Sequence, residues 1–151
     1  MTLLNIPITR TKSGFDDIEL PHFATEGAAG MDVRAAVETP VTLEKGAVAM
    51  IPTGLACAVP AGYEMQVRSR SGLAAKFGVF CLNAPGTIDS DFRGEIHIIL
   101  ANFGTEPYTI QRGDRIAQLV VARYERVEWT LQSELPATER GAGGFGSTGK
   151  A

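Results

Sequence analysis

The sequence predicts an all-β fold, a β-sandwich or distorted jelly roll, in a single domain. Short apolar segments recur along the chain and are separated by turn signals rich in proline and glycine. No long pattern of helical period interrupts them. With 151 residues the chain can bury a core without disulfides or a structural metal. Many short strands must hide their edges, which favours two packed sheets or a closed roll.

The individual elements can be placed in chain order. Residues 63–68 alternate between apolar and polar side chains, as a strand with one solvated face requires. Residues 71–77 are the one helical candidate, of about one or two turns. The segment 83–94 is expected to form a hairpin or long turn between two apolar strands. Residues 95–101 and 116–122 are predicted to be more deeply buried strands.

The C-terminal part has a different composition. Alternation resumes from Val127 to Leu131, residues 132–138 have the character of a linker, and the last residues are almost free of apolar side chains. We therefore divide the chain into a β domain, 1–138, and a mobile glycine-rich arm, 139–151. An isolated strand before such an arm favours pairing with, or reaching toward, a neighbouring subunit. On composition alone, a disordered terminus is the simpler interpretation.

Charge and apolar patterning exclude several classes of protein. The net charge is −3 with acids and bases interspersed, whereas duplex-binding surfaces concentrate positive charge. The N-terminal segment is too short for a signal peptide, and no apolar run approaches the roughly 20 residues of a membrane span. We expect a cytoplasmic protein that binds neither nucleic acid nor membrane. Cys57 and Cys81 lie in apolar segments without CxxC spacing, which predicts reduced, buried thiols.

The glycine-rich arm imitates two phosphate-binding motifs. A GxGxxG spacing occurs at 141–146, but no strand precedes it and no helix follows. A Walker A spacing ends on Ala151, where the motif needs Ser or Thr. Glycines nevertheless let the backbone approach a ligand closely. The arm also offers side chains suited to a nucleotide, with Phe145 placed to stack on a base: Arg140, Phe145, Ser147 and Thr148.

Within the segment 83–94, Asp89 is the candidate for acid–base chemistry. Ile88 anchors it at a strand end, where a carboxylate can be held rigidly and act as a general base. Ser90 and Asp91 are better explained as turn formers. A purely structural role in the turn is the alternative for Asp89 as well.

Three further segments carry polar residues that mean little one by one. Arg70 and Ser71 lie where a strand gives way to a helical turn, which suits an anion site, or Ser71 is a simple N-cap. Asp32 begins a strand. Gln118 lies within a buried strand and needs a hydrogen-bond partner there.

Taken together and in this order, the segments resemble the five motifs of the trimeric dUTPases, over nearly the whole chain. The matching stretches are Ala29-Gly30-x-Asp32, Arg70-Ser71-Gly72, Gly86-x-Ile88-Asp89, Arg112-Gly113-Asp114-Arg115-Ile116-Ala117-Gln118 and Arg140-Gly141-x-Gly143-Gly144-Phe145-Gly146. The resemblance implies a β-clip jelly-roll homotrimer with active sites shared between subunits. It also implies Mg2+-assisted hydrolysis of dUTP to dUMP and pyrophosphate, which supplies dUMP for dTTP synthesis and keeps uracil out of DNA.

The resemblance also implies a role for each motif. Asp89 would activate the water that attacks the α-phosphorus, and Asp32 would hold the water shell of Mg2+, which the substrate phosphates bind directly. The remaining residues would bind the substrate. The uracil and sugar would lie against Asn83, Gly86, Thr87, Ile88, Phe92, His97 and Phe145, and the phosphates against Arg70, Ser71, Gly72, Gln118, Arg140, Gly146, Ser147 and Thr148.

Two positions depart from the family's pattern. Phe92 stands where the family commonly has Tyr, and because it keeps the ring we expect discrimination against UTP to survive. Ser69 stands where the family tends to have Pro, which is expected to change only local stiffness. His97 aligns with a position of the uracil pocket, although a histidine in a strand also suits a structural role.

Two alternatives share parts of this pattern. A dCTP deaminase would have the same fold and bind a similar triphosphate, but the segment 83–94 resembles the hydrolase version. A non-catalytic nucleotide sensor would have no need of a positioned base such as Asp89 or of a complete arm.

Overall fold

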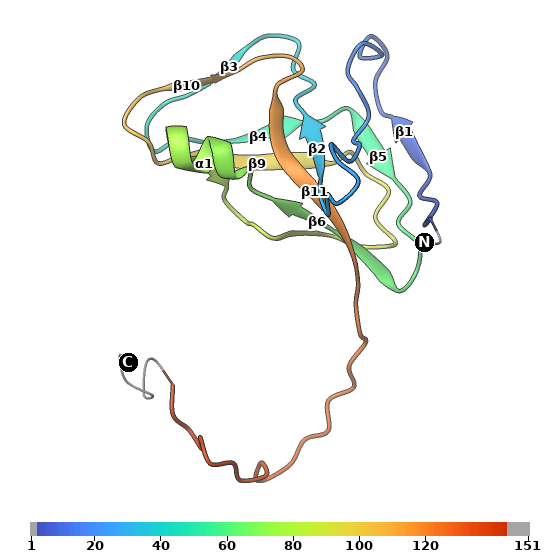
Figure 1. The fold of residues 1–151 in the computed structure, drawn as a ribbon, viewed down its shortest axis with the longest axis vertical. Helices are drawn as coiled ribbons and strands as arrows, with labels where there is room; N and C mark the ends of the chain where they lie inside the picture. The colour runs from blue at the N-terminus through green and yellow to red at the C-terminus, as the bar shows by residue number, and fades with distance from the viewer. Residues whose placement is uncertain (1–2, 145–151) are drawn as a thin grey trace.

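Strands make up almost all of the regular structure in residues 3–144, the part of the chain that the computed structural model describes (Figure 1). One short helix lies among them. The elements are β1 (Ile8–Arg10), β2 (Met31–Arg34), β3 (Val41–Leu43), β4 (Val48–Pro52), β5 (Leu55–Cys57), β6 (Tyr63–Arg68), α1 (Ser71–Phe77), β7 (Val79–Cys81), β8 (Gly86–Ile88), β9 (His97–Asn102), β10 (Tyr108–Ile110) and β11 (Arg115–Arg123). The all-β prediction is confirmed.

Two antiparallel sheets enclose the core. One has the strand order β2-β11-β6-β8 and the other β4-β9-β7, while β1-β5 and β10-β3 form two-stranded sheets. Side chains from both larger sheets belong to one buried apolar cluster, which includes Val33, Ile51, Val67, Ile98 and Leu119. Each such side chain contributes roughly 1.5–3 kcal/mol through burial. This shared core makes the fold the sandwich that the short strands predicted.

Helix α1 is fastened at its C-terminal end by a close backbone contact. Gly78 adopts the left-handed conformation, with φ of 66°, and its N–H caps the helix by donating to the carbonyl of Ala74. Beside it, a Cβ on Gly104 would stand 2.1 Å from the Phe77 carbonyl oxygen. The buried Asn102 accepts a hydrogen bond from the Gly104 N–H at 2.9 Å. This contact joins the end of α1 to the loop that follows β9.

Gly104→Ala is therefore expected to destabilise the fold by about 1–3 kcal/mol, because backbone rather than a flexible side chain must move. The free energy of unfolding in urea measures the effect. Gly27→Ala is the matched control, because a Cβ on Gly27 meets nothing within 4 Å. Equal stability of the two variants would show that the contact is not tight in solution.

Several predicted boundaries need correction. The strand expected at 95–101 begins at His97, and the backbone of Ile96 before it bonds instead to Thr53 and Leu55, where β4 gives way to β5. The segment 83–94 connects β7 and β9, which pair antiparallel as a hairpin or long turn requires, but the connection also contains β8, which pairs with β6. In contrast, α1 and β6 match their predictions to within a residue.

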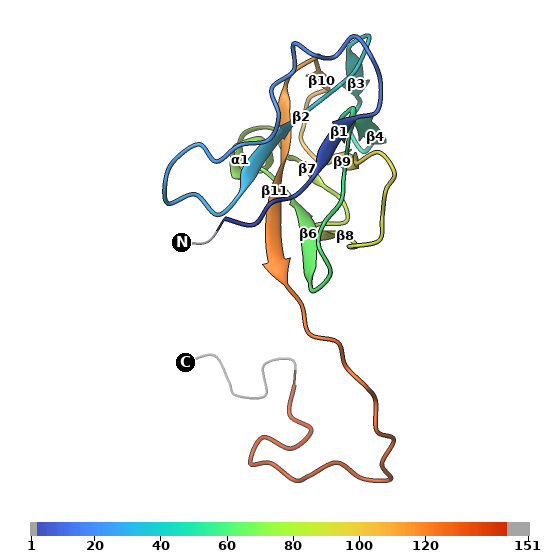
Figure 2. The same ribbon diagram turned by 90° about the vertical axis from the view of Figure 1, so that its right-hand side faces the viewer.

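The chain leaves the sandwich after β11. Figures 1 and 2 both show the following segment running away from the strands. No strand forms at 127–131 in the single chain, and Val127, Trp129 and Leu131 are 70%, 91% and 99% exposed. Large apolar side chains at this exposure have no partner within residues 3–144. The domain division at 138/139 stays a prediction.

Both cysteines are free and buried, as predicted. Burial raises the pKa of the Cys57 and Cys81 thiols, which keeps them protonated. Within residues 3–144, no helix has the length and apolar character needed to cross a bilayer.

Candidate functional site

Asp32, Arg70, Arg115 and Gln118 meet in one group, which we call the Asp32 cluster. The register of β2, β11 and β6 sets Asp32 and Arg68 on either side of Gln118. The Asp32 carboxylate lies 3.0 Å from the Arg115 guanidinium and 3.4 Å from that of Arg70. The Gln118 amide donates to the same carboxylate at 3.3 Å. Residues from three of the five sequence motifs are thus brought together.

The electrostatics of the Asp32 cluster suit an anion. It holds one carboxylate and two guanidinium groups, so one positive charge is left over. The side chains of Asp32 and Arg70 are only 18% and 22% exposed, whereas Arg115 is 49% exposed. Interactions between partly buried charges are screened less by solvent than those at the open surface. A phosphate at this position would therefore find a preformed, partly desolvated positive group.

The loop that leads from β6 into α1 is held by a hydrogen bond to β7. The Ser69 hydroxyl accepts a hydrogen bond from the Cys81 N–H at 2.9 Å, which ties the loop to β7. Arg70 is the N-cap residue of α1, without a side-chain cap, so the interpretation of Ser71 as the N-cap is wrong. Ser71 and Gly72 are the first two residues of the helix and both are exposed. Their side of the loop is open to a ligand.

Asp89 lies on a different part of the molecule, the segment around β8. Ile88 ends β8 and is 7% exposed, while Asp89 follows it and is exposed. The Asp89 carbonyl accepts a hydrogen bond from the Phe92 N–H at 3.2 Å, which closes a turn. Ile88 thus ends a strand with Asp89 directly after it, as expected, and the role of Asp89 as a general base stays a prediction.

Asn83 and Gly86 are packed against each other on this segment. A Cβ on Gly86 would stand 3.0 Å from the Asn83 amide nitrogen and 3.3 Å from Val67. Gly86 is buried and Thr87 is exposed. A side chain at position 86 would displace the Asn83 amide, so the two residues act as one unit.

Phe92 and His97 lie farther along the chain. The Phe92 ring covers Gly94, where an added Cβ would stand 2.6 Å from the ring, and it is 43% exposed. His97 begins β9, is exposed and pairs with Pro52 across the sheet. Its Nδ1 lies 3.2 Å from the Glu95 carbonyl oxygen. Membership of a uracil pocket stays a prediction for both residues.

The Asp32 cluster and Asp89 lie at opposite ends of the β6-β8 pairing. Arg68 is level with Gln118, whereas Ile88 is level with Met65. The three steps from Met65 to Arg68 span roughly 10 Å at the usual rise of a strand. From there Asp89 and Arg70 continue in opposite directions. One chain therefore does not place Asp89 beside its own Asp32 cluster.

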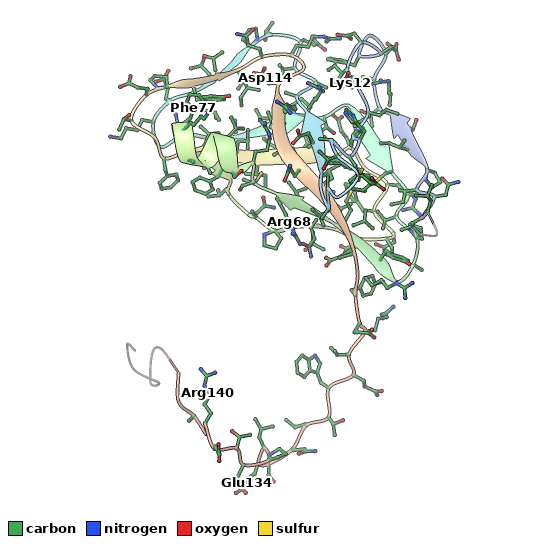
Figure 3. All side chains as sticks on the ribbon, viewed as in Figure 1. Lys12, Arg68, Phe77, Asp114, Glu134 and Arg140 are labelled. Atoms are coloured by element: carbon green, nitrogen blue, oxygen red, sulfur yellow. The ribbon has the colours of Figure 1, made fainter. Side chains whose placement is uncertain are left out.

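Arg140 lies still farther away. Figure 3 shows it in the arm, well apart from Arg68 on the sandwich. Its Nε donates to the Gly143 carbonyl at 2.9 Å, and the arm around it is exposed. The other predicted arm residues, Phe145, Gly146, Ser147 and Thr148, lie outside the described residues.

Sequence reasoning missed the roles of two arginines. Arg115 completes the Asp32 cluster, and only the register of β11 against β2 reveals it. Arg112 binds Asp17 at 2.6 Å, lies 4.1 Å from the centre of the Phe15 ring and lowers the pKa of Asp17 through its hydrogen bond. Arg112 therefore fastens the N-terminal loop to the β10–β11 turn.

The fold is an all-β sandwich, and its partly buried, net positive cluster and exposed carboxylate at a strand end suit an enzyme that binds phosphates. The dUTPase family model matches residues 16–149. The chain is 54% identical to the deoxyuridine 5'-triphosphate nucleotidohydrolase of Anaplasma marginale over 97% of this chain and 99% of the relative. It is 57% identical to that of Desulfotalea psychrophila over 89% of each. The chain belongs to the dUTPase family.

Solved structures have the same fold. The dUTPase of Staphylococcus bacteriophage 80alpha with dUPNHPP matches with a TM-score of 0.85 and 26% sequence identity, over 97% of this chain and 99% of that one. The match extends over nearly the whole length of both chains. It confirms the fold that the strand pattern predicted.

Proposed function

We propose that the protein hydrolyses dUTP to dUMP and pyrophosphate, at active sites assembled from different copies of the chain in a homotrimer. Membership of the dUTPase family and the five motifs support the substrate and the reaction. A related structure holds the dUTP analogue dUPNHPP. The reaction supplies dUMP for dTTP synthesis and keeps uracil out of DNA, and we expect it to take place in the cytoplasm.

The separation of Asp89 from the Asp32 cluster is the observation that carries the shared site. A general base must lie within about 3 Å of the water it activates. That water must in turn attack an α-phosphorus held by Arg70 and Gln118. With β6 alone putting roughly 10 Å between Met65 and Arg68, one chain does not satisfy both needs. Both needs are satisfied when Asp89 of one copy lies beside the Asp32 cluster of another copy.

Each group then has one task. The Arg70 guanidinium, with Ser71 and Gly72 at the start of α1, holds the phosphate oxygens where negative charge develops as pyrophosphate leaves. Gln118 orients the α-phosphate. Asp89 takes the proton of the attacking water, whose oxygen forms the new bond to phosphorus while the bond to the bridging oxygen breaks.

The base and sugar are expected to lie against the β8 segment. Asn83, held against Gly86, offers one amide donor and one acceptor for the uracil edge, and the backbone of Thr87 and Ile88 completes the contact. The Phe92 ring lies beside the sugar. His97 is expected at the pocket's margin on the resemblance alone.

The residues present fit Mg2+ as a partner of the substrate. Within residues 3–144 no group of three or more His, Cys, Asp or Glu side chains is arranged to hold a metal. Mg2+ commonly keeps several of its bound waters. The side-chain oxygen atoms of Asp32 and Gln118, at the phosphate end of the site, can accept hydrogen bonds from such waters. When bound to the triphosphate, Mg2+ neutralises its charge and orients it.

The arm is expected to reach another copy. Val127, Trp129 and Leu131 are largely exposed in the segment that leads from β11 to the arm. The same chain carries an apolar groove of about 770 Å3, whose lining includes Phe23 and Leu119. Within residues 3–144 neither the apolar segment 127–131 nor the apolar groove has a partner, which suits a reciprocal exchange between copies. The residues beyond, from Arg140 to Thr148, would then close over a neighbour's phosphates and uracil.

Mixing two inactive variants tests the shared site. Asp89→Asn removes the general base, and Arg70→Gln removes a phosphate-binding group of the Asp32 cluster. Neither variant alone is therefore expected to hydrolyse dUTP well. After joint refolding in equal amounts, random assembly gives about a quarter of sites with both halves intact, and we expect about a quarter of wild-type turnover. Pyrophosphate release measures it.

A mixture of wild type with the double variant Asp89→Asn, Arg70→Gln is the control. Shared sites again give about a quarter of full turnover, whereas sites within one chain give about half. No recovery in the first mixture and half in the second would refute the shared site while leaving dUTP hydrolysis intact.

A further inference from the structure

A β-bulge in β11 directs Arg115 into the Asp32 cluster. Arg115 pairs with Arg34 and Ala117 pairs with Val33, so Ile116 is one residue more on β11 than on β2. In a regular strand Arg115 would share its face with Ala117, which is buried in the core. The extra residue turns Arg115 to the opposite face, which carries the carboxylate of the cluster.

The position of this bulge also fixes Arg70. The Arg70 guanidinium donates to the Arg115 carbonyl at 2.7 Å, in addition to its contact with one oxygen of the Asp32 carboxylate. The Arg115 guanidinium reaches the other oxygen of the same carboxylate. The backbone and side chain of one residue therefore set both cations of the cluster, and a displaced bulge would misplace both.

The turn that leads into the bulge, residues 111–114, is braced within itself. The Asp114 N–H donates to the Gln111 carbonyl at 3.1 Å, and the Asp114 carboxylate accepts a hydrogen bond from the Gln111 N–H at 2.8 Å. Two hydrogen bonds between the ends of a four-residue turn make it move as one piece. A contact that holds the turn at one point therefore also holds the bulge that follows it.

Arg34 provides such a contact from β2. Its guanidinium donates to the Gly113 carbonyl at 3.0 Å through one nitrogen and to the Glu19 carboxylate through another. The backbone supports the same contact, because the Ala35 N–H donates to the Asp114 carbonyl at 2.8 Å. The planar fork of an arginine with two fixed partners has little freedom left.

The segment that carries Glu19 is itself fastened to the sandwich. The Arg10 guanidinium donates to the carbonyl of Phe15 at 2.8 Å and to that of Ile18 at 2.7 Å. Phe15 and Ile18 also form a small buried apolar cluster with Ala36. The Glu19 carboxylate is therefore presented to Arg34 from an anchored backbone.

We propose that Arg34 is a positioning residue for triphosphate binding and that Glu19 braces it. Arg34 fixes the Gly113 carbonyl, and with it the turn and the bulge. Arg70 and Arg115 then converge on one carboxylate before the phosphates arrive. Arranging the cations in advance lowers the cost of ordering them on binding. The proposal rests on the proposed function, which puts the phosphates at the Asp32 cluster.

The test compares how full-length variants bind the analogue dUPNHPP and dUMP, measured by calorimetric titration. Arg34→Gln is expected to weaken dUPNHPP binding by about 10-fold, the scale of one lost hydrogen bond from a charged group. Glu19→Gln is expected to weaken it by about 3-fold, because only the brace is lost. For dUMP, which has one phosphate in place of three, both losses should be no more than about 2-fold.

A double variant and a control show whether the effect passes through Arg34. If Glu19 acts only through Arg34, the double variant Glu19→Gln, Arg34→Gln should bind dUPNHPP no more weakly than Arg34→Gln alone. Asp16→Asn is the matched control on the same segment, because Asp16 pairs with Arg10 at 3.3 Å. It should bind dUPNHPP as wild type does. Circular dichroism shows that each variant keeps the fold.

The outcomes separate this proposal from the proposed function. Wild-type affinity for dUPNHPP in Arg34→Gln would overturn the positioning role, while dUTP hydrolysis by wild type would leave the function standing. Tighter binding by Glu19→Gln would overturn it too, because an arginine freed from its brace would then contact the phosphates itself. Equal losses for dUPNHPP and dUMP would assign Arg34 to the stability of the fold alone. A wild type that neither binds dUPNHPP nor hydrolyses dUTP would overturn the function and the positioning role together.

Discussion

Asp89→Asn is expected to bind dUTP almost as tightly as wild type and to lose about 10²–10⁴-fold in turnover. The amide has nearly the shape of the carboxylate but cannot take a proton from the attacking water. Because Asp89 is exposed and Ile88 anchors the backbone beneath it, the change should leave the fold intact. Calorimetric titration with a non-hydrolysable dUTP analogue measures binding, and pyrophosphate release measures turnover.

Asp91→Asn is the matched control, because it makes the same chemical change two positions along the same turn. Asp91 is exposed and, in the residues described, no ion pair involves its carboxylate. It should keep turnover within about 3-fold of wild type. Normal turnover in Asp89→Asn would remove Asp89 from the role of base, and lost binding would assign it to substrate contact instead.

Ending the chain after Thr138 is expected to leave a folded trimer that hydrolyses dUTP at least about 10-fold more slowly. The truncation keeps Val127 to Leu131 for the contact between copies and removes Arg140 with the glycine-rich residues that follow. Without them the phosphates lose a cation and the site stays open to water. Light scattering and initial rates measure the two effects on one sample.

A chain ending at Lys150 controls for the act of truncation and should behave as wild type. Full hydrolysis by the protein that ends at Thr138 would contradict the role of the arm in closing the site. Loss of the trimer in that protein would instead show that the arm residues beyond Thr138 hold the copies together.

The fold could be predicted from the sequence largely because its strands carry clear local signals. Local sequence patterns predict the alternation in β6 and the short helix α1, and both elements lie where expected. The place of β8 is different, since three residues within a presumed turn become a strand only through pairing with β6. Long-range registers of this kind leave no local signal.

The site was predictable as a set of segments but not as a geometry. Asp32, Arg70 and Gln118 were singled out separately, and their meeting depends on the register of β11 with β2 and β6. Arg115 joins them for the same reason. Ser71 was expected as a possible N-cap, yet it is the first residue of the helix and Arg70 is the N-cap residue. The distance between Asp89 and the Asp32 cluster, on which the shared site depends, is a property of the folded sheet alone.

The most direct test of dUTP hydrolysis offers the purified protein dUTP and dCTP with Mg2+ and measures pyrophosphate and ammonia. We expect one pyrophosphate and one dUMP for each dUTP consumed, and no ammonia from dCTP. Ammonia from dCTP without pyrophosphate from dUTP would contradict it in favour of a deaminase. Tight binding of dUTP with neither product would contradict it in favour of a nucleotide sensor.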